Sequence, residues 1–348
     1  MKKTLLTLAL ASLPAVSAAM SDSPDSSPVD ETVEYPAADT VVRFIAIGDS
    51  GTGKDGQYKV AAALEAVCAA KGCDFAIGLG DNIYESGVDS IDDIQFDLKF
   101  EDPYQNLNFP FYMALGNHDN SWIIGGDGAN NQRGDIQVDY HYREDRKSEK
   151  WQMPARYYQF DAPASGTPLV SFFSMDTNPV ASAGDPSDEF NKDDYAQTQG
   201  QWLRQGFTAS TAPWKIAYGH HPYISNGSHG NAGNYDSLIG QGKYFKQMVE
   251  QHVCGNADFL IVGHTHALQW LKQVDSCPGT GHIVSGAGAK TKNFLTKTEL
   301  NDYHWQQDDI LGFFYIEIQG DELRGTAYTV NPDSGAFQPA YQRTVQRR

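Results

Sequence analysis

Several apolar segments of this chain end in the same way, with a glycine followed by a polar residue. The clearest case is FAIGLGDNIY, where the apolar run 75–79 stops at Gly80 and Asp81 follows. A buried strand that ends like this delivers a carboxylate to a loop at the edge of a sheet. One such ending would be an ordinary polar turn. The ending recurs in GDSG, GNHD, GHH and GHTH, and turns alone do not explain this recurrence.

The polar residues at these strand ends are of the types that bind metal ions, namely carboxylate, amide and imidazole groups. Tyr84 follows Asp81 closely enough for both side chains to reach one point. His264 and His266 are separated by one residue, so both point to the same side of an extended strand end. The candidate ligands are Asp49, Asp81, Tyr84, Asn117, His220, His264 and His266.

The size of this set favours two metal ions. Seven donors are too many for one tetrahedral zinc, and they suit two ions that share a bridging carboxylate. Any one of these histidines, taken alone, is more often a satisfied core or surface residue than a ligand. The seven residues together indicate a metal site far more strongly than any one of them does.

The N-terminal segments predict export. Residues 1–19 have two lysines, a short apolar run and then small residues, which is typical of a secretory signal peptide. Residues 20–40 are rich in serine, proline and acidic residues and predict a disordered linker. We therefore expect a periplasmic or secreted protein, with a retained N-terminal anchor as the alternative. Residues 41–348 suit one large domain, or two closely fused halves.

The cysteines and the net charge limit the roles of the thiols and the partners that the protein can bind. An even number of cysteines in an exported chain predicts disulfides, and sequence proximity favours Cys68–Cys73 and Cys254–Cys277 among the three possible pairings. None lies in a CxxC motif, which argues against zinc binding or redox catalysis by these residues. The net charge of −18 argues against nucleic acid and anionic membranes as partners. An anionic substrate is still compatible, because bound metal ions dominate the local field.

The order of expected elements predicts an α/β fold. A strand at 41–49, a helix at 57–70 and a strand at 75–79 form a βαβ unit, which should cross over right-handed. Two stacked mixed β-sheets flanked by helices fit the whole chain, with every ligand on a loop at one rim. We further expect a helix at 91–100, an irregular loop at 120–150, one strand within 151–163, helices at 197–209 and about 237–252, and late strands in HIVSGAG, GFFYIEIQG and ELRGTAYTV.

The motifs GDSG, GDNIY, GNHD, GHHP and GHTH, in this order, resemble those of the metallophosphoesterase superfamily. Within it, GDNxY and GHxH resemble the purple acid phosphatases, especially the small type related to mammalian tartrate-resistant acid phosphatase. The resemblance runs from about residue 41 to residue 288 and includes SGAG at 285–288. The tyrosine at position 84 separates this family from other superfamily members. The resemblance implies the αββα sandwich of the superfamily.

The resemblance implies a dinuclear Fe(III)–M(II) centre, in which the second, divalent metal is Fe, Zn or Mn. It implies a metal-bound hydroxide nucleophile and a small phosphomonoester substrate, hence an acid phosphatase. The implied Fe(III) ligands are Asp49, Asp81, Tyr84 and His266, and the implied ligands of the divalent ion are Asp81, Asn117, His220 and His264, with Asp81 bridging. Anionic oxygens suit a hard trivalent ion, whereas imidazoles and an amide suit a divalent one.

Three further residues gain candidate catalytic roles from the resemblance. His118 matches the histidine that contacts the phosphoryl group and helps to protonate the leaving alcohol. Asp119 either orients His118 or stabilises the adjacent turn. His229 stands in the place of a second histidine of the family. His221 departs from the pattern of the small type; we expect it to pack rather than to contact substrate, and the GHxP register makes His220 the ligand.

Two alternatives remain open from the sequence. A phosphodiesterase or nucleotidase of the same superfamily would use a related site, although the tyrosine at position 84 argues against it. An exported iron redox protein is the other. The natural substrate and the oligomeric state are not encoded in any of these patterns.

Overall fold

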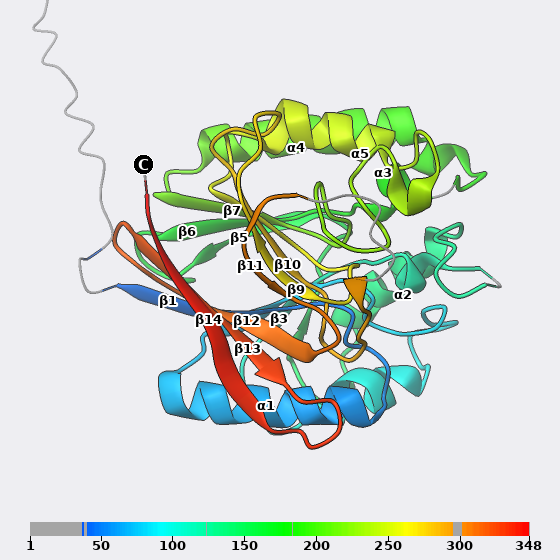
Figure 1. The fold of residues 1–348 in the computed structure, drawn as a ribbon. Helices are drawn as coiled ribbons and strands as arrows, with labels where there is room; N and C mark the ends of the chain where they lie inside the picture. The colour runs from blue at the N-terminus through cyan, green and yellow to red at the C-terminus, as the bar shows by residue number, and fades with distance from the viewer. Residues whose placement is uncertain (1–36, 38–39, 123, 183, 295–300, 348) are drawn as a thin grey trace, which may run out of the picture. The chain divides into compact units, whose positions relative to one another are not determined.

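Two seven-stranded β-sheets stack on each other and helices cover their outer faces (Figure 1). This confirms the expected pair of mixed sheets flanked by helices. The predicted signal peptide and nearly all of the predicted linker lie outside the described part of the chain. A computed structural model describes residues 37, 40–122, 124–182, 184–294 and 301–347.

The first sheet has a parallel half and an antiparallel half. Its order is β14-β13-β12-β1-β2-β3-β4, with β1 to β4 parallel and β12 antiparallel to β1. Because β1, β2 and β3 run the same way, the residues that follow them meet at one edge of the sheet. The strands are β1 (Val41–Ile47), β2 (Phe75–Leu79), β3 (Phe111–Ala114), β4 (Trp151–Gln152), β12 (Leu311–Gln319), β13 (Glu322–Val330) and β14 (Phe337–Gln346).

The second sheet is also mixed. Its order is β11-β9-β10-β8-β7-β6-β5, and β6, β7, β8 and β10 are parallel. The parallel strands β7 and β8 carry the GHH and GHTH segments at their carboxyl ends. The strands are β5 (Tyr158–Ala162), β6 (Val170–Ser174), β7 (Trp214–Tyr218), β8 (Phe259–Val262), β9 (Leu268–Leu271), β10 (Gly281–Ser285) and β11 (Tyr303–Gln307).

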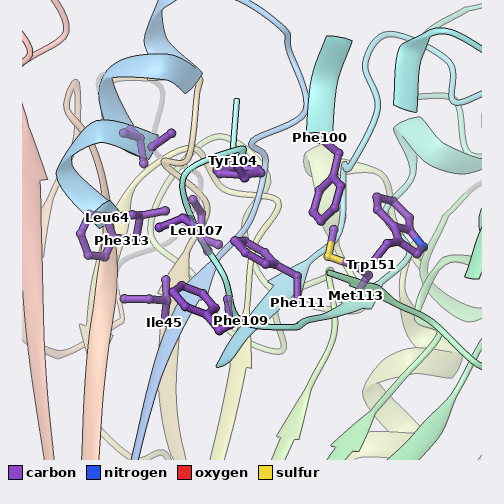
Figure 2. Close-up of a cluster of buried hydrophobic side chains, with 14 of the residues drawn as sticks. Ile45, Leu64, Phe100, Tyr104, Leu107, Phe109, Phe111, Met113, Trp151 and Phe313 are labelled. Atoms are coloured by element: carbon purple, nitrogen blue, oxygen red, sulfur yellow. The ribbon is translucent and has the colours of Figure 1, made fainter. Parts of the chain in front are cut away.

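Helix α1 (Asp55–Lys71) covers the outer face of the first sheet (Figure 1). Val60, Leu64 and Val67 recur at helical spacing and are buried, so they form the face that packs on the sheet. Asp55 in the first turn and Lys71 in the last complement the helix dipole. The core beneath is largely aromatic, with Leu64 and Ile45 near Phe111 and Phe313 (Figure 2).

Two further hydrophobic clusters complete the layers. One lies between the sheets and includes Phe44, Phe172 and Trp270. The other joins the second sheet to the helices on its outer face, with Leu203 and Phe245 among its members. Those helices are α3 (Asn178–Ala181), α4 (Lys192–Ala209), α5 (Lys243–Met248) and the π-helix η5 (Val249–Val253).

Several local predictions were wrong. The expected helix at 91–100 begins later, at residue 95, and continues into the π-helix η1 (Asp97–Glu101), while residues 91–94 form turns. Ile94 and Leu98 are exposed, whereas Phe96 and Phe100 are buried in the core, so only part of the apolar pattern faces inward. The expected irregular loop at 120–150 contains α2 (Gln132–His141), whose apolar face is too weak to predict a helix. The single strand expected within 151–163 is two strands, β4 and β5, and the late strands β9, β11 and β14 were missed.

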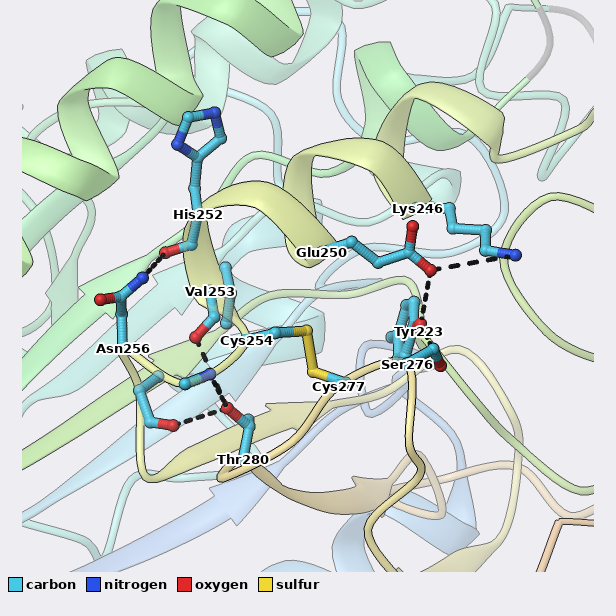
Figure 3. The surroundings of a disulfide bond; sticks show 12 residues. Tyr223, Lys246, Glu250, His252, Val253, Cys254, Asn256, Ser276, Cys277 and Thr280 are labelled. Atoms are coloured by element: carbon cyan, nitrogen blue, oxygen red, sulfur yellow. Dashed lines mark hydrogen bonds and ion pairs between the residues drawn. A yellow bond between two sulfur atoms is a disulfide. The ribbon is translucent and has the colours of Figure 1, made fainter.

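Both disulfides favoured by sequence proximity are present, Cys68–Cys73 and Cys254–Cys277. The second joins the end of η5 to the loop before β10 (Figure 3). Next to it, the Thr280 hydroxyl donates to the Ala257 carbonyl at 2.7 Å, and the Tyr223 hydroxyl donates to Glu250 at 2.7 Å. Within the described ranges, every helix is too short or too polar to span a bilayer.

Candidate metal centre

The loops that follow β1, β2, β3, β7 and β8 meet at one edge of the two sheets and bring together the polar residues that end these strands. Three of them, Asp49, Asp81 and His264, have left-handed backbone conformations, with φ of 59°, 55° and 66°. This conformation is uncommon for residues other than glycine, and strained residues of this kind cluster at functional sites. The backbone thus marks this edge independently of the side-chain chemistry.

One group of donor atoms forms a triangle around Tyr84. Its phenolic oxygen lies 3.1 Å from Asp49 Oδ1 and 3.3 Å from His266 Nε2, and the latter two atoms are 3.3 Å apart. Tyr84 and Asp49 are buried, and the His266 side chain is 16% exposed. The group therefore opens to solvent on the His266 side.

A second triangle lies around Asn117. Its Oδ1 is 2.8 Å from His220 Nε2 and 3.0 Å from His264 Nδ1, and the two imidazole nitrogens are 3.1 Å apart. Asp81 lies between the two triangles, with its Oδ1 3.4 Å from His220 Nε2 and a carboxylate oxygen within 4.8 Å of a ligand atom of Asp49. Ligand atoms of Asp49, Asp81 and His220 all lie within 4.8 Å of one another, and these residues could hold a metal ion.

Hydrogen bonds to the surrounding protein direct two acceptor atoms into the second triangle. His220 Nδ1 is 2.8 Å from the Leu79 carbonyl oxygen, which only accepts, so Nδ1 carries the proton. In the neutral ring, Nε2 is then an acceptor. The Asn117 side-chain amide donates to the Gly126 carbonyl at 3.0 Å, which directs its oxygen, another acceptor, at Nε2. Two acceptors that face each other fit a shared metal ion.

The pKa values of residues in the centre also favour bound cations. Burial, and then the charges of Asp49 and Asp81, raise the pKa of Tyr84 well above its ordinary value. Burial raises the pKa of Asp49 to about 7 and lowers that of His266 to about 4. Several acidic oxygens in one buried space ionise together only when cations lie among them. The neutral imidazole of His266 is the form that binds metals.

The glycines before these residues allow the strand ends to approach closely. A Cβ atom on Gly116 would lie 2.2 Å from Asp81 Oδ1, and one on Gly80 would lie 2.7 Å from His220 Nδ1. Gly80 also has a positive φ of 83°. The glycine in each ending is therefore required by packing against the neighbouring loop, which explains why the pattern recurs.

His118 lies beside the centre. Its backbone N–H donates to Asp81 Oδ1 at 2.9 Å, and its ring centroid is 4.4 Å from that of Tyr84. Nδ1 is 2.6 Å from the Glu85 carbonyl oxygen, so Nδ1 carries a proton and Nε2 is the free ring nitrogen. The carboxylate of Asp119 points elsewhere and accepts from the backbone N–H groups of Asn82 and Gly116 at 3.0 and 2.8 Å. These contacts favour the turn-stabilising role for Asp119 over orientation of His118.

His229 and His221 flank the second triangle. The ring of His229 lies 4.2 Å from that of His264, and its Nδ1 is 2.8 Å from Asp236 Oδ1. His221 is buried, with Nδ1 2.8 Å from the Thr177 hydroxyl and Nε2 3.3 Å from Ser182. Since both ring nitrogens of His221 are engaged within the protein, its contacts agree with the expected packing role.

Sequence reasoning did not single out Glu85, Lys290 or Asp236. Glu85 and Lys290 lie against His118 and Tyr84, and Asp236 holds His229. Charged residues in loops follow no periodicity, so their pattern carries no signal. The position of Lys290 two residues after SGAG was the one available hint.

The stacked sheets and the buried oxygen- and nitrogen-donor cluster at one edge define a metal-dependent hydrolase of phosphate esters. The model of the calcineurin-like phosphoesterase family matches residues 42–268, and the chain belongs to this family. The expected resemblance to the purple acid phosphatases is likewise confirmed by the relatives described next.

The chain is 29% identical to purple acid phosphatase 4 of Arabidopsis thaliana, over 87% of this chain and 85% of that protein. It is 27% identical to human tartrate-resistant acid phosphatase type 5, over 83% and 87% of the respective chains. Among solved structures, the fold is similar to GAP50, the anchor in the inner membrane complex of Plasmodium, with a TM-score of 0.68, 19% identity and 88% and 89% coverage. It is also similar to PhoD, with a TM-score of 0.55, 14% identity and 88% and 70% coverage.

Proposed function

We propose that this chain is an exported acid phosphatase that hydrolyses small phosphomonoesters at a dinuclear Fe(III)–M(II) centre. The observation that carries the proposal is the arrangement of two donor triangles joined by Asp81. The Tyr84 triangle, with anionic oxygens, suits Fe(III), and the Asn117 triangle suits a divalent Fe, Zn or Mn ion. The names of the similar acid phosphatases support the same reaction.

In this proposal Asp49, Asp81, Tyr84 and His266 hold the iron, and Asp81, Asn117, His220 and His264 hold the divalent ion. When bound, the ions would polarise the phosphoryl oxygens and activate a water molecule for in-line attack.

His118 serves as the general acid of the proposed reaction. The Glu85 carbonyl holds one proton on Nδ1, so in the imidazolium form the second proton is on Nε2. Nε2 gives that proton to the leaving alcohol when the ester P–O bond breaks, and the ring becomes neutral. His229, whose Nδ1 is held by Asp236, keeps Nε2 for a phosphoryl oxygen. Asp119 acts as a positioning residue beneath both loops.

Export is part of the proposal, with residues 1–19 as the signal peptide, residues 20–40 as the linker and residues 41–348 as the phosphoesterase domain. The two disulfides support an oxidising compartment.

Metal analysis combined with an activity assay tests the function. Protein produced with adequate iron should contain about two metal ions per chain, at least one of them iron, and should hydrolyse p-nitrophenyl phosphate faster than bis-p-nitrophenyl phosphate. A single zinc without iron would overturn the centre, and a preference for the diester would overturn the substrate class.

A further inference from the structure

Lys290 is a cation placed directly over Tyr84. It lies in the segment after β10, and its ammonium nitrogen is 3.8 Å from the centroid of the Tyr84 ring. The same nitrogen is 3.7 Å from Glu85 Oε2, and that carboxylate oxygen is 3.8 Å from His118 Nδ1. Glu85 therefore lies between Lys290 and His118, on the side of the centre from which the proposed general acid acts.

The backbone around Lys290 is held to the metal centre and is not a free surface loop. Gly288 N–H donates to the Gly48 carbonyl at 3.0 Å, next to Asp49, and Lys292 N–H donates to the His266 carbonyl at 3.2 Å. The side chain of Lys290 is only 29% exposed. Because hydrogen bonds on both sides anchor this segment to residues that flank or form the Tyr84 triangle, the position of the ammonium group relative to the centre is well defined.

The pair between Lys290 and Glu85 is suited to exchange. The Glu85 side chain is 62% exposed, and both of its contacts are longer than a hydrogen bond. Exposed pairs of this geometry contribute little stability, so Lys290 gives up the carboxylate at little cost when a better anion arrives. A phosphate group, which accepts short charge-assisted hydrogen bonds, is such an anion.

Because the protein is strongly acidic, a cation beside the centre matters for the binding of an anionic substrate. At a net charge of −18, the molecule as a whole repels a polyanionic substrate. Lys290 and the exposed Lys292 are the cations that the segment after β10 presents next to His266 and Tyr84. A local cation beside the leaving-group acid selects for leaving groups that carry their own negative charge.

We propose that Lys290 is a specificity-determining residue that binds an anionic leaving group, with a phosphate preferred, by exchanging the Glu85 carboxylate for it. The substrate class that follows is the diphosphates, in which the group that departs is itself a phosphate. The inference rests on the proposed function, because the position of His118 defines the leaving-group side.

The test compares inorganic pyrophosphate with phenyl phosphate, whose leaving group is neutral once it is protonated. Lys290→Gln should lower the ratio of kcat/KM for pyrophosphate to kcat/KM for phenyl phosphate about tenfold, the usual scale for one charged hydrogen bond. Lys290→Arg should restore much of the ratio. Lys272→Gln, at the far end of β9, is the charge-matched control and should leave the ratio unchanged.

Glu85→Gln provides a test in the opposite direction. Removal of the competing carboxylate charge should raise the ratio, and the double variant Glu85→Gln/Lys290→Gln should match Lys290→Gln. Calorimetric titration of the metal-loaded protein with imidodiphosphate and with inorganic phosphate gives a readout without turnover. Lys290→Gln should weaken binding of imidodiphosphate and leave that of phosphate nearly unchanged, with metal content measured before and after.

Equal losses for both substrates, or a lower ratio in Glu85→Gln, would overturn the role of Lys290. Those outcomes differ from a failure of the proposed function, in which the parent protein with its full metal content hydrolyses neither substrate.

Discussion

The carboxylate of Asp119 accepts hydrogen bonds from the backbone of Asn82, with Asp119 Oδ1 3.0 Å from the Asn82 nitrogen, and so ties the loop after β3 to the loop after β2. The same carboxylate accepts from the Ile83 and Gly116 N–H groups and from the Gln137 side chain. It is completely buried. One side chain therefore holds together the two loops that carry Asp81 and Asn117.

Asp119→Ala should destabilise the protein and loosen metal binding. The substitution leaves several buried N–H groups without an acceptor, at a cost of about 3 kcal/mol or more. Urea unfolding measures the stability, and dialysis against a weak chelator measures the metal retained. Asp139→Ala, an exposed aspartate on α2, is the control. An Asp119→Ala protein as stable as that control would show that the loops do not depend on this carboxylate.

Tyr84→Phe should remove the colour expected of an iron(III)–phenolate pair. The ring and its packing are retained and only the oxygen is lost, so circular dichroism should be unchanged. Activity should fall only in part, because Asp81 and the Asn117 triangle remain. The visible absorption spectrum of the iron-loaded variant is the measurement. An unchanged visible band would remove Tyr84 from the proposed ligand set.

His118→Ala should have the converse effect, with colour retained and turnover reduced. Removal of a general acid typically costs 10²- to 10⁴-fold in rate. The loss should be smaller for p-nitrophenyl phosphate than for an alkyl phosphate, because p-nitrophenolate leaves without a proton. Steady-state rates on the two substrates give the comparison. If both rates fall equally, His118 is not the proton donor.

The sequence predicted which polar residues gather at the sheet edge better than it predicted the helices and strands around them. A ligand at a strand end follows from a local pattern, glycine after an apolar run, and the tight approach of Gly116 to Asp81 shows why that pattern is forced. Helix α2 lacks such a signal, since it is held by specific contacts such as Gln137 with Asp119 and not by an apolar stripe. The sequence left two roles open for Asp119, because most of its partners lie in another loop or on α2.

His282 should make the protein acid-sensitive. It is buried on β10, neither ring nitrogen has a hydrogen-bond partner among the described residues, and burial lowers its pKa to about 4. As the pH falls below about 6.5, His282 binds a proton in the unfolded state. In the native state the same histidine binds a proton only when the pH falls to about 4. Stability is therefore lost as the pH falls through this window, by about 2 kcal/mol at pH 5.

His282→Leu should remove this contribution. Urea unfolding at pH 7 and pH 5 should show a smaller loss for the variant than for the parent. His141→Leu, on α2, controls for the loss of a histidine as such. A parent and a His282→Leu variant with equal pH dependence would contradict the assignment.

The two disulfides should differ in their contribution to stability. Cys254–Cys277 closes a loop with a sequence separation of 23, and Cys68–Cys73 one of 5. The entropy of loop closure then predicts losses of about 3 kcal/mol for Cys254→Ser/Cys277→Ser and about 2 kcal/mol for Cys68→Ser/Cys73→Ser. Chemical denaturation of the two double variants tests the order. A larger loss for the short loop would mean that local packing dominates.

The donors of the centre come from both sheets, with Asp49, Asp81 and Asn117 after strands of the first and His220 and His264 after strands of the second. Neither sheet holds a complete set, so the proposed ligands come together only when the two sheets dock. Tight binding of the proposed metals would therefore require that both sheets have folded and docked. A partly folded or truncated chain would stay metal-free and hydrolytically silent wherever it is found.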